Sequence, residues 1–189
     1  METSEGQTPS KEIVVPQKRK LIRDRYPEIF KKKGVKRVTG IAESTEYGIL
    51  LDEKLTEEAM EWMEAYDPKE LADVLEVIDA QCVFRTRKYT PVSLRKISES
   101  DKELIQAIKT AVNDPDRDIF NGMFLSQIDK WSQTHDFKDL ARVMGIVHAA
   151  GQLSRRPANI AQLEGLRHGK HAELGGFTKR VVLEPETAV

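Results

Sequence analysis

The chain has 189 residues, a length that fits one domain with a sizeable core. Its 30 basic and 31 acidic residues give a net charge of −1, which disfavours functions that depend on overall charge, such as binding to a nucleic-acid polymer or a membrane surface. No apolar run approaches the ~18 residues of a membrane span, and residues 1–10 lack the pattern of a signal peptide. We therefore expect a soluble, cytoplasmic protein, in which the single cysteine, Cys82, is a small buried hydrophobe.

The N-terminal part divides into a polar stretch and a basic one. Residues 1–16 contain little apolar material and predict a disordered tail. Ten of the twenty residues from 18 to 37 are Lys or Arg, with apolar residues interleaved, and a short helix is expected from Pro27 to Gly34. The basic run indicates a solvated or phosphate-facing surface. A duplex-binding patch is the alternative, which the few aromatic residues and the neutral overall charge disfavour.

Two helices are predicted next, separated by a break at Asp67-Pro68. Residues 51–66 carry one apolar stripe at spacings of three and four, formed by Leu51, Leu55, Ala59, Trp62 and Tyr66. Residues 69–85 are apolar on two faces, which is typical of a helix buried in the protein or at a subunit interface. A fold-back at the break would make the two helices antiparallel neighbours.

Each of these helices carries a pair of acids three residues apart, Glu58 with Glu61 and Glu70 with Asp73. Residues at this spacing share a helix face, so a fold-back brings four carboxylates together. Such a group repels itself unless a cation lies among its members, and hard oxygen ligands suit Mg²⁺ or Mn²⁺. The pattern predicts a metal site, although acid pairs at this spacing also occur on solvated helices.

Further helical patterns follow residues 89–91. We expect Ser100 to cap a helix over residues 101–112, residues 113–115 to end it and start another, and Asp136 and Pro157 to open two more. Residues 175–184 read as a loop followed by a short extended strand. No internal repeat is evident. His168 and His171 have a spacing that a transition metal could use, but surface histidines are the simpler interpretation.

Three separated stretches resemble one known family. They are Lys20-Leu21-Ile22-Arg23-Asp24-Arg25-Tyr26-Pro27-Glu28, the acid pairs in Glu57-Glu58-Ala59-Met60-Glu61 and Glu70-Leu71-Ala72-Asp73-Val74-Leu75-Glu76, and Gly175-Gly176-Phe177-Thr178-Lys179-Arg180. Their order and spacing resemble the phosphoribosyl-ATP pyrophosphohydrolase-like branch of the MazG-type all-α nucleotide pyrophosphohydrolases. The resemblance covers residues 20–84 and about 170–184.

The resemblance implies an all-α fold, a MazG-like helical bundle with antiparallel metal-binding helices and a short extended C-terminal segment. Residues 17–84 and 170–185 would form the core, and residues 85–169 would be a helical insertion packed on it, serving as a lid, a replacement for a subunit contact or a partner site. Members of this family are usually homo-oligomers, dimers or larger, that split nucleoside triphosphates into monophosphate and pyrophosphate with Mg²⁺.

The resemblance and the charge logic together assign roles to residues. Metal would be held by Glu58, Glu61, Glu70 and Asp73, with one of these four, or the neighbouring Glu57 or Glu76, as the base. Phosphate would be bound by Lys20, Arg23, Lys179 and Arg180. We expect house-cleaning of non-canonical nucleotides, with phosphoribosyl-ATP as the weaker substrate candidate. The alternative is a non-catalytic nucleotide-sensing or protein-interaction module on the same fold.

Overall fold

The all-α prediction is confirmed. A computed structural model describes residues 18–86 and 88–185, and this part of the chain is mainly helical with three short strands; the predicted tail over residues 1–16 lies outside it. The elements are β1 (Lys20–Leu21), α1 (Tyr26–Lys33), β2 (Thr39–Ile41), α2 (Ser44–Ala65), α3 (Pro68–Arg85), α4 (Pro91–Ser100), α5 (Lys102–Asn113), α6 (Arg117–Thr134), α7 (Phe137–Leu153), α8 (Ile160–Leu174) and β3 (Val181–Leu183). Among the described residues, no helix is both long enough and apolar enough to cross a membrane.

The helices α2 and α3 form the antiparallel hairpin that the sequence predicts. Tyr66 ends α2 in the left-handed conformation, and its N–H donates to Trp62 O. Asp67 then caps α3 by accepting a hydrogen bond from Lys69 N at 2.9 Å, and Pro68 occupies the first helical position, where its missing N–H costs nothing. This two-residue turn reverses the chain and places the two helices side by side.

Three predicted helix starts are wrong, and one helix was not predicted. The helix α6 begins after Asp116 rather than within residues 113–115, because the Asp116 carboxylate accepts from Asp118 N at 2.9 Å. Ser100 ends α4, a helix that sequence analysis missed, and Asp101 is the cap of α5 because its carboxylate accepts from Leu104 N at 3.0 Å. The last helix begins after Asn159 rather than at Pro157, since Asn159 and Gln162 form a capping box. The predicted cap at Asp136 is confirmed.

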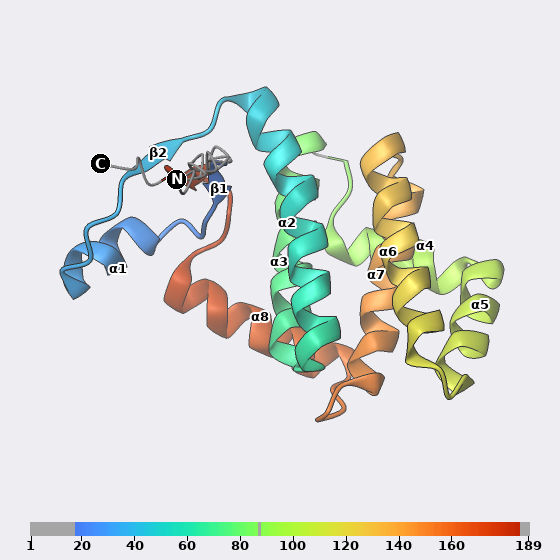
Figure 1. The fold of residues 1–189 in the computed structure, drawn as a ribbon. Coiled ribbons are helices and arrows are strands. Elements are labelled where there is room, and N and C mark those ends of the chain that lie inside the picture. Colours follow the sequence, from blue (N-terminus) through green and yellow to red (C-terminus); the bar gives the residue numbers. More distant parts are fainter. Residues whose placement is uncertain (1–17, 87, 186–189) are drawn as a thin grey trace, which may run out of the picture.

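The α2–α3 hairpin lies in the middle of the molecule (Figure 1). On one side α6 and α7 pack against α2 and α3, with α4 and α5 beyond them; on the other lie α8, α1 and the small sheet. Trp62 is completely buried, donates from Nε1 to Ser154 Oγ at 3.0 Å, and contacts the rings of Phe120 and Phe124 edge-on. The helices α6 and α7 therefore pack on the hairpin, and residue 170, where a boundary was predicted, lies within α8.

The strands bring the two ends of the described chain together. The strand β3 lies between β1 and β2 and pairs antiparallel with both, with Leu21 opposite Val182 and Gly40 opposite Val182. The expected extended segment near the C-terminus is thus the central strand of a three-stranded sheet. The sheet fixes residues 20–25 beside residues 174–184, and both segments face the α2–α3 hairpin.

Burial of α3 among other helices predicts a contrast between two valines on that helix. Val77 is fully buried, whereas Val83 is 59% exposed. Val77→Ala should lower the free energy of unfolding by about 1–3 kcal/mol, because two buried methyl groups are lost and a cavity remains. Val83→Ala should change it by less than about 0.5 kcal/mol. Urea unfolding of both variants measures the difference, and equal effects would contradict the placement of α3.

Candidate metal and phosphate site

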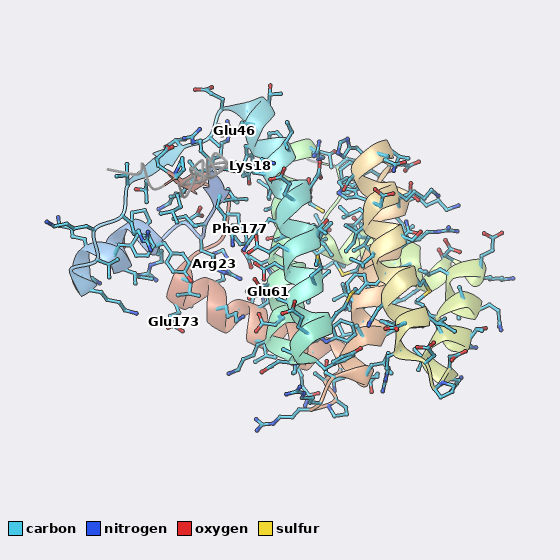
Figure 2. All side chains as sticks on the ribbon, viewed as in Figure 1. Lys18, Arg23, Glu46, Glu61, Glu173 and Phe177 are labelled. Atoms are coloured by element: carbon cyan, nitrogen blue, oxygen red, sulfur yellow. The ribbon has the colours of Figure 1, made fainter. Side chains whose placement is uncertain are left out.

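A pocket of about 380 Å³ opens between the sheet, α8 and the α2–α3 hairpin, within the range of ~300–1,000 Å³ that is usual for ligand sites. Its lining includes the acids Glu58, Glu61 and Asp73 and the cations Lys20, Arg23, Lys54 and Lys170. Figure 2 shows Arg23, Glu61 and Phe177 on the same side of α2, toward the sheet and α8. The pocket is therefore lined by charges of both signs.

Three of the four predicted metal ligands converge beside this pocket, and two of them, Glu58 and Asp73, line it, whereas Glu70 does not. The group consists of one carboxylate oxygen from each of three residues, Glu58, Glu70 and Asp73, and these three oxygens lie within 4.8 Å of one another. Glu61 also lines the pocket, but its side chain is exposed and it lies outside this close group. The antiparallel hairpin produces the convergence, because Glu58 lies two turns before the end of α2 and Asp73 lies between one and two turns into α3.

Lys54 balances the charge of Glu58. Its Nζ lies 2.6 Å from Glu58 Oε1 and 3.1 Å from Glu57 Oε1. Burial raises the pKa of Glu58 to about 7, even though Lys54 acts in the opposite direction; Asp73 and Glu61 add to the rise. Burial would lower the pKa of Lys54, but Glu58 and Glu57 outweigh it and raise this pKa. Glu58, the most buried carboxylate of the close group, therefore gains or loses its proton near neutral pH.

Lys170 approaches the other two acids from α8. Its Nζ forms an ion pair with Asp73, lies 3.7 Å from Glu70 Oε2, and donates to Lys69 O at 3.0 Å. Burial raises the pKa of Glu70, and the neighbouring Asp73 and Glu61 raise it further against the opposing effect of Lys170. The ammonium group thus occupies a position beside the Glu70 and Asp73 carboxylates, as a bound cation would.

Arg23 connects the two chain ends to the acids. Its side chain is buried, forms an ion pair with Asp73, donates from Nη1 to Gly175 O at 2.8 Å, and lies over the Phe177 ring, 5.0 Å from the centroid. Arg23, which the sequence predicts as a phosphate ligand, therefore also links the segment after β1 to α3 and to Gly175. Together Arg23, Lys54 and Lys170 place three positive charges beside the three carboxylates of Glu58, Glu70 and Asp73.

Asp24 joins the first and third resembling motifs. It is buried and accepts hydrogen bonds from Lys179 N at 3.0 Å and Thr178 Oγ1 at 3.3 Å. Asp24 is therefore a structural partner of the 175–180 segment. Gly176 lies so close to Glu76 that a Cβ there would approach Glu76 Oε1 to 2.7 Å. The Gly-Gly pair therefore allows this backbone to pass over a buried carboxylate.

The remaining predicted phosphate ligands lie in different places. Lys20 lines the pocket, and its Nζ is 2.7 Å from Glu57 Oε1. Lys179 is exposed, and Arg180 donates to Ser44 Oγ at 2.8 Å with its guanidinium over the Tyr47 ring. Neither of these two residues lines the pocket.

Glu57 is not part of the pocket lining either. It holds Lys20 and Lys54, and their hydrogen bonds lower its pKa although burial acts to raise it. Glu57 therefore positions two cations beside the acids. Its role as the base, one of the choices that the sequence offered, stays a prediction.

The two histidines of α8 also have partners. His171 Nδ1 lies 2.7 Å from Glu76 Oε1, and Arg167 pairs with Glu76 and Asp79 at 3.2 and 3.5 Å. His168 Nε2 lies 3.1 Å from Arg167 Nη2. These contacts form a ladder between α8 and α3, which supports the interpretation of the histidines as groups outside a transition-metal site.

The donor set fits a small divalent cation. Ligand oxygens around octahedral Mg²⁺ lie at ~2.0–2.1 Å from the ion, so opposite ligands are about 4.2 Å apart. Glu58, Glu70 and Asp73 supply three carboxylate oxygens within 4.8 Å of one another. Adjacent ligands of an octahedral Mg²⁺ are about 3 Å apart, so these side chains would draw closer together around a bound ion. All donors are hard oxygens, which favours Mg²⁺ or Mn²⁺ over softer metals.

Sequence reasoning missed Lys54 and Lys170. Lys54 precedes Glu57 and Glu58 by three and four residues, a spacing that predicts contact on a helix. Lys170 lies on α8, almost 100 residues from its partners, and no local pattern could have assigned it to them.

The raised pKa of Glu58 predicts a dependence of stability on pH. The folded protein holds this proton up to about pH 7, whereas the unfolded chain releases it near pH 4.5, so the folded state binds more protons between these values and the free energy of unfolding falls as pH rises. Glu58→Gln should remove about 1–3 kcal/mol of this fall, since one pKa unit corresponds to about 1.4 kcal/mol.

Glu57→Gln is the matched control, because the pKa of Glu57 is lowered and its contribution is therefore lost as pH falls. Urea unfolding between pH 5 and 8 in chelator should show a flatter pH dependence for Glu58→Gln and an unchanged one for Glu57→Gln, because Glu57 is largely ionised in both the folded and the unfolded state over this range. Parallel slopes would contradict the electrostatic description of this site.

Comparison with known proteins adds no relative to this geometry: no family model matches the chain, and neither a curated protein nor a solved structure matches it significantly. The resemblance in the three motifs therefore stays a prediction.

Proposed function

We propose that the protein is a Mg²⁺-dependent nucleotide pyrophosphohydrolase, which converts a nucleoside triphosphate or related nucleotide into the monophosphate and pyrophosphate. The observation that carries the proposal is the convergence of Glu58, Glu70 and Asp73 beside a pocket that Glu58 and Asp73 line together with several cations. Acids that could hold a metal and cations that could hold phosphate thus share one space. The motif resemblance supports the same activity.

The cations of the pocket match a polyphosphate in charge. Lys20, Lys54 and Lys170 present ammonium groups, and Arg23 presents a guanidinium, all in the lining. Lysine and arginine are the usual ligands of phosphate oxygens. When an anionic substrate enters, Lys170 can transfer its contacts from Asp73 to phosphate, which leaves the acids to the metal. A bound Mg²⁺ would neutralise phosphate oxygens and lower the pKa of a water molecule.

The acids divide into two roles by their surroundings. Glu58, Glu70 and Asp73 form the close group that would hold the cation. Glu61 lines the pocket and, among the described residues, has no ion-pair partner. It is therefore the carboxylate available to accept a proton from a water that attacks the α-phosphorus. The bond to the bridging oxygen then breaks, and pyrophosphate leaves.

A non-catalytic nucleotide-binding module is the second candidate. The observation that favours it is that Lys54, Lys170 and Arg23 already neutralise the acids without a metal. A scaffold of this kind would bind nucleotide through the same cations and release no product.

Substitution of Glu61 tests its role as the base. Glu61→Gln should lower kcat by about 10²–10⁴-fold, the usual contribution of general-base catalysis. Glu64→Gln, an exposed position on the same helix, is the matched control and should keep the parental rate. Steady-state release of pyrophosphate measures both. A Glu61→Gln rate within a few-fold of the parent would remove this residue from the mechanism.

A nucleotide panel in H₂¹⁸O tests the reaction itself. With Mg²⁺ or Mn²⁺ present, we expect monophosphate and pyrophosphate as products, with ¹⁸O in the monophosphate because water attacks the α-phosphorus. Chelator should abolish turnover. Mass spectrometry of both products identifies the attacked atom and the substrate together. If every nucleotide is bound but none is cleaved, the binding module is the correct description.

A further inference from the structure

The turns of the hairpins α2–α3 and α6–α7 are built in the same way. Tyr66 and His135 both end a helix in the left-handed conformation, with φ of 49° and 50°. The N–H of each donates to the carbonyl of a tryptophan four residues earlier, Trp62 or Trp131. In each case the next residue is an aspartate that caps the following helix by accepting from the N–H of a lysine at 2.9 Å.

A shift of 69 residues aligns the two hairpins in sequence. Residues 62–82 and 131–151 then have seven of 21 positions identical, including the Trp, the capping Asp and the Lys after it. The buried positions also coincide: Leu51, Leu55, Ala59, Leu71, Val74 and Val77 correspond to Phe120, Phe124, Ile128, Leu140, Val143 and Ile146, and all of these are buried. One pattern of apolar positions therefore accounts for both hairpins.

The contacts between the hairpins are reciprocal under the same shift. His135 Nε2 lies 2.9 Å from Asp52 Oδ2, and the corresponding pair is Tyr66 with Asn121, where Asn121 Nδ2 lies 3.1 Å from Tyr66 Oη. A second case involves the tryptophans. Trp62 donates to Ser154, while Trp131 lies beneath the guanidinium of Arg85, the residue that corresponds to Ser154.

In each case, a residue of one hairpin contacts a residue of the other, and the two equivalent residues make the reverse contact. Such reciprocal contacts define a two-fold interface between equal units. Figure 1 shows α2–α3 beside α6–α7. The two hairpins therefore pack against each other as two copies of one unit would.

The positions of the metal ligands differ between the hairpins. Glu58, Glu61, Glu70 and Asp73 correspond to Gln127, Lys130, Asp139 and Arg142. Three of the latter still converge: Lys130 Nζ and Gln127 Nε2 lie 2.9 and 3.3 Å from Asp139 Oδ1. Arg142 instead pairs with Asp101 at 2.8 Å. The second hairpin retains the arrangement of the site but has an amide and two cations where the first has acids.

We propose that α6–α7 is a second copy of the α2–α3 hairpin in which the metal site has been replaced by internal ion pairs. This inference rests on the proposed metal site for its functional part. The chain then contains one metal-binding copy and one structural copy, and the structural copy covers the apolar face of α3. Restoring the acids should therefore create a second metal site at Asp139.

The test is the number of Mn²⁺ ions bound to the full chain, measured by electron paramagnetic resonance titration. The parent should bind one ion, and the variant Gln127→Glu, Lys130→Glu, Arg142→Asp should bind two. In an Asp73→Asn background the same variant should return to one, which separates the two sites. The control variant Gln133→Glu, Lys138→Glu, Arg117→Glu has the same charge change at exposed positions of α6 and α7 and should bind one.

A second variant keeps the test valid if the triple variant does not fold. Gln127→Glu, Lys130→Glu leaves the pair of Arg142 with Asp101 intact and should bind the added ion more weakly, with circular dichroism reporting the helical content. Folded variants that still bind one ion would overturn the equivalence of the two sites. A parent that binds none while the restored variant binds one would support the duplication and reject the proposed metal site. No ion on any protein would reject both.

Discussion

The structure depends on how α2 and α3 are held antiparallel by a two-residue turn while carboxylates gather along one face of the pair. Glu58, Glu70 and Asp73 repel one another across the hairpin, so a fold that brings them together must supply positive charge. It does so from three separate segments: Lys54 from α2, Arg23 from the loop after β1, and Lys170 from α8. Arg23 and Lys170 also attach their segments to the hairpin.

The small sheet and α8 position two of the cations, Arg23 and Lys170, beside the acids. The sheet pairs β1 with β3 and so places Arg23 and Asp24 against residues 174–179. The ladder of Arg167, Lys170 and His171 along α3 then fixes α8 across the end of the site. The pocket is therefore enclosed by residues from both ends of the described chain, and charge neutralisation is coupled to closure of the fold.

The opposite side of the hairpin has the reverse character. There α6 and α7 bury the apolar positions of α2 and α3 with few charges, and the reciprocal contacts of Asp52 with His135 and of Tyr66 with Asn121 mark a pseudo-two-fold relation. A helix such as α3, apolar on two faces, needs a neighbour on each. In this chain a related hairpin is one neighbour and α8 is the other. The charged pocket and the apolar contacts are thus on different faces of the same pair of helices.

The sequence by itself determined the helical class, the α2–α3 hairpin and the residues that carry its charge, because these depend on spacing over a few turns and on the break at Asp67-Pro68. Burial of Trp62, Trp131 and Cys82 followed from the same periodicity. The sequence did not distinguish Ser100 from Asp101 as the cap of α5, since both are good capping residues and they are neighbours.

Only the tertiary structure decided what lies opposite these elements. It brought Lys170 to Asp73, placed Lys179 and Arg180 outside the pocket, and revealed the second hairpin through its reciprocal contacts. The physical reason is that contacts between residues 55 to 97 positions apart depend on how whole helices pack. A repeat that keeps buried positions but exchanges its charged ones also leaves a weak signal in sequence.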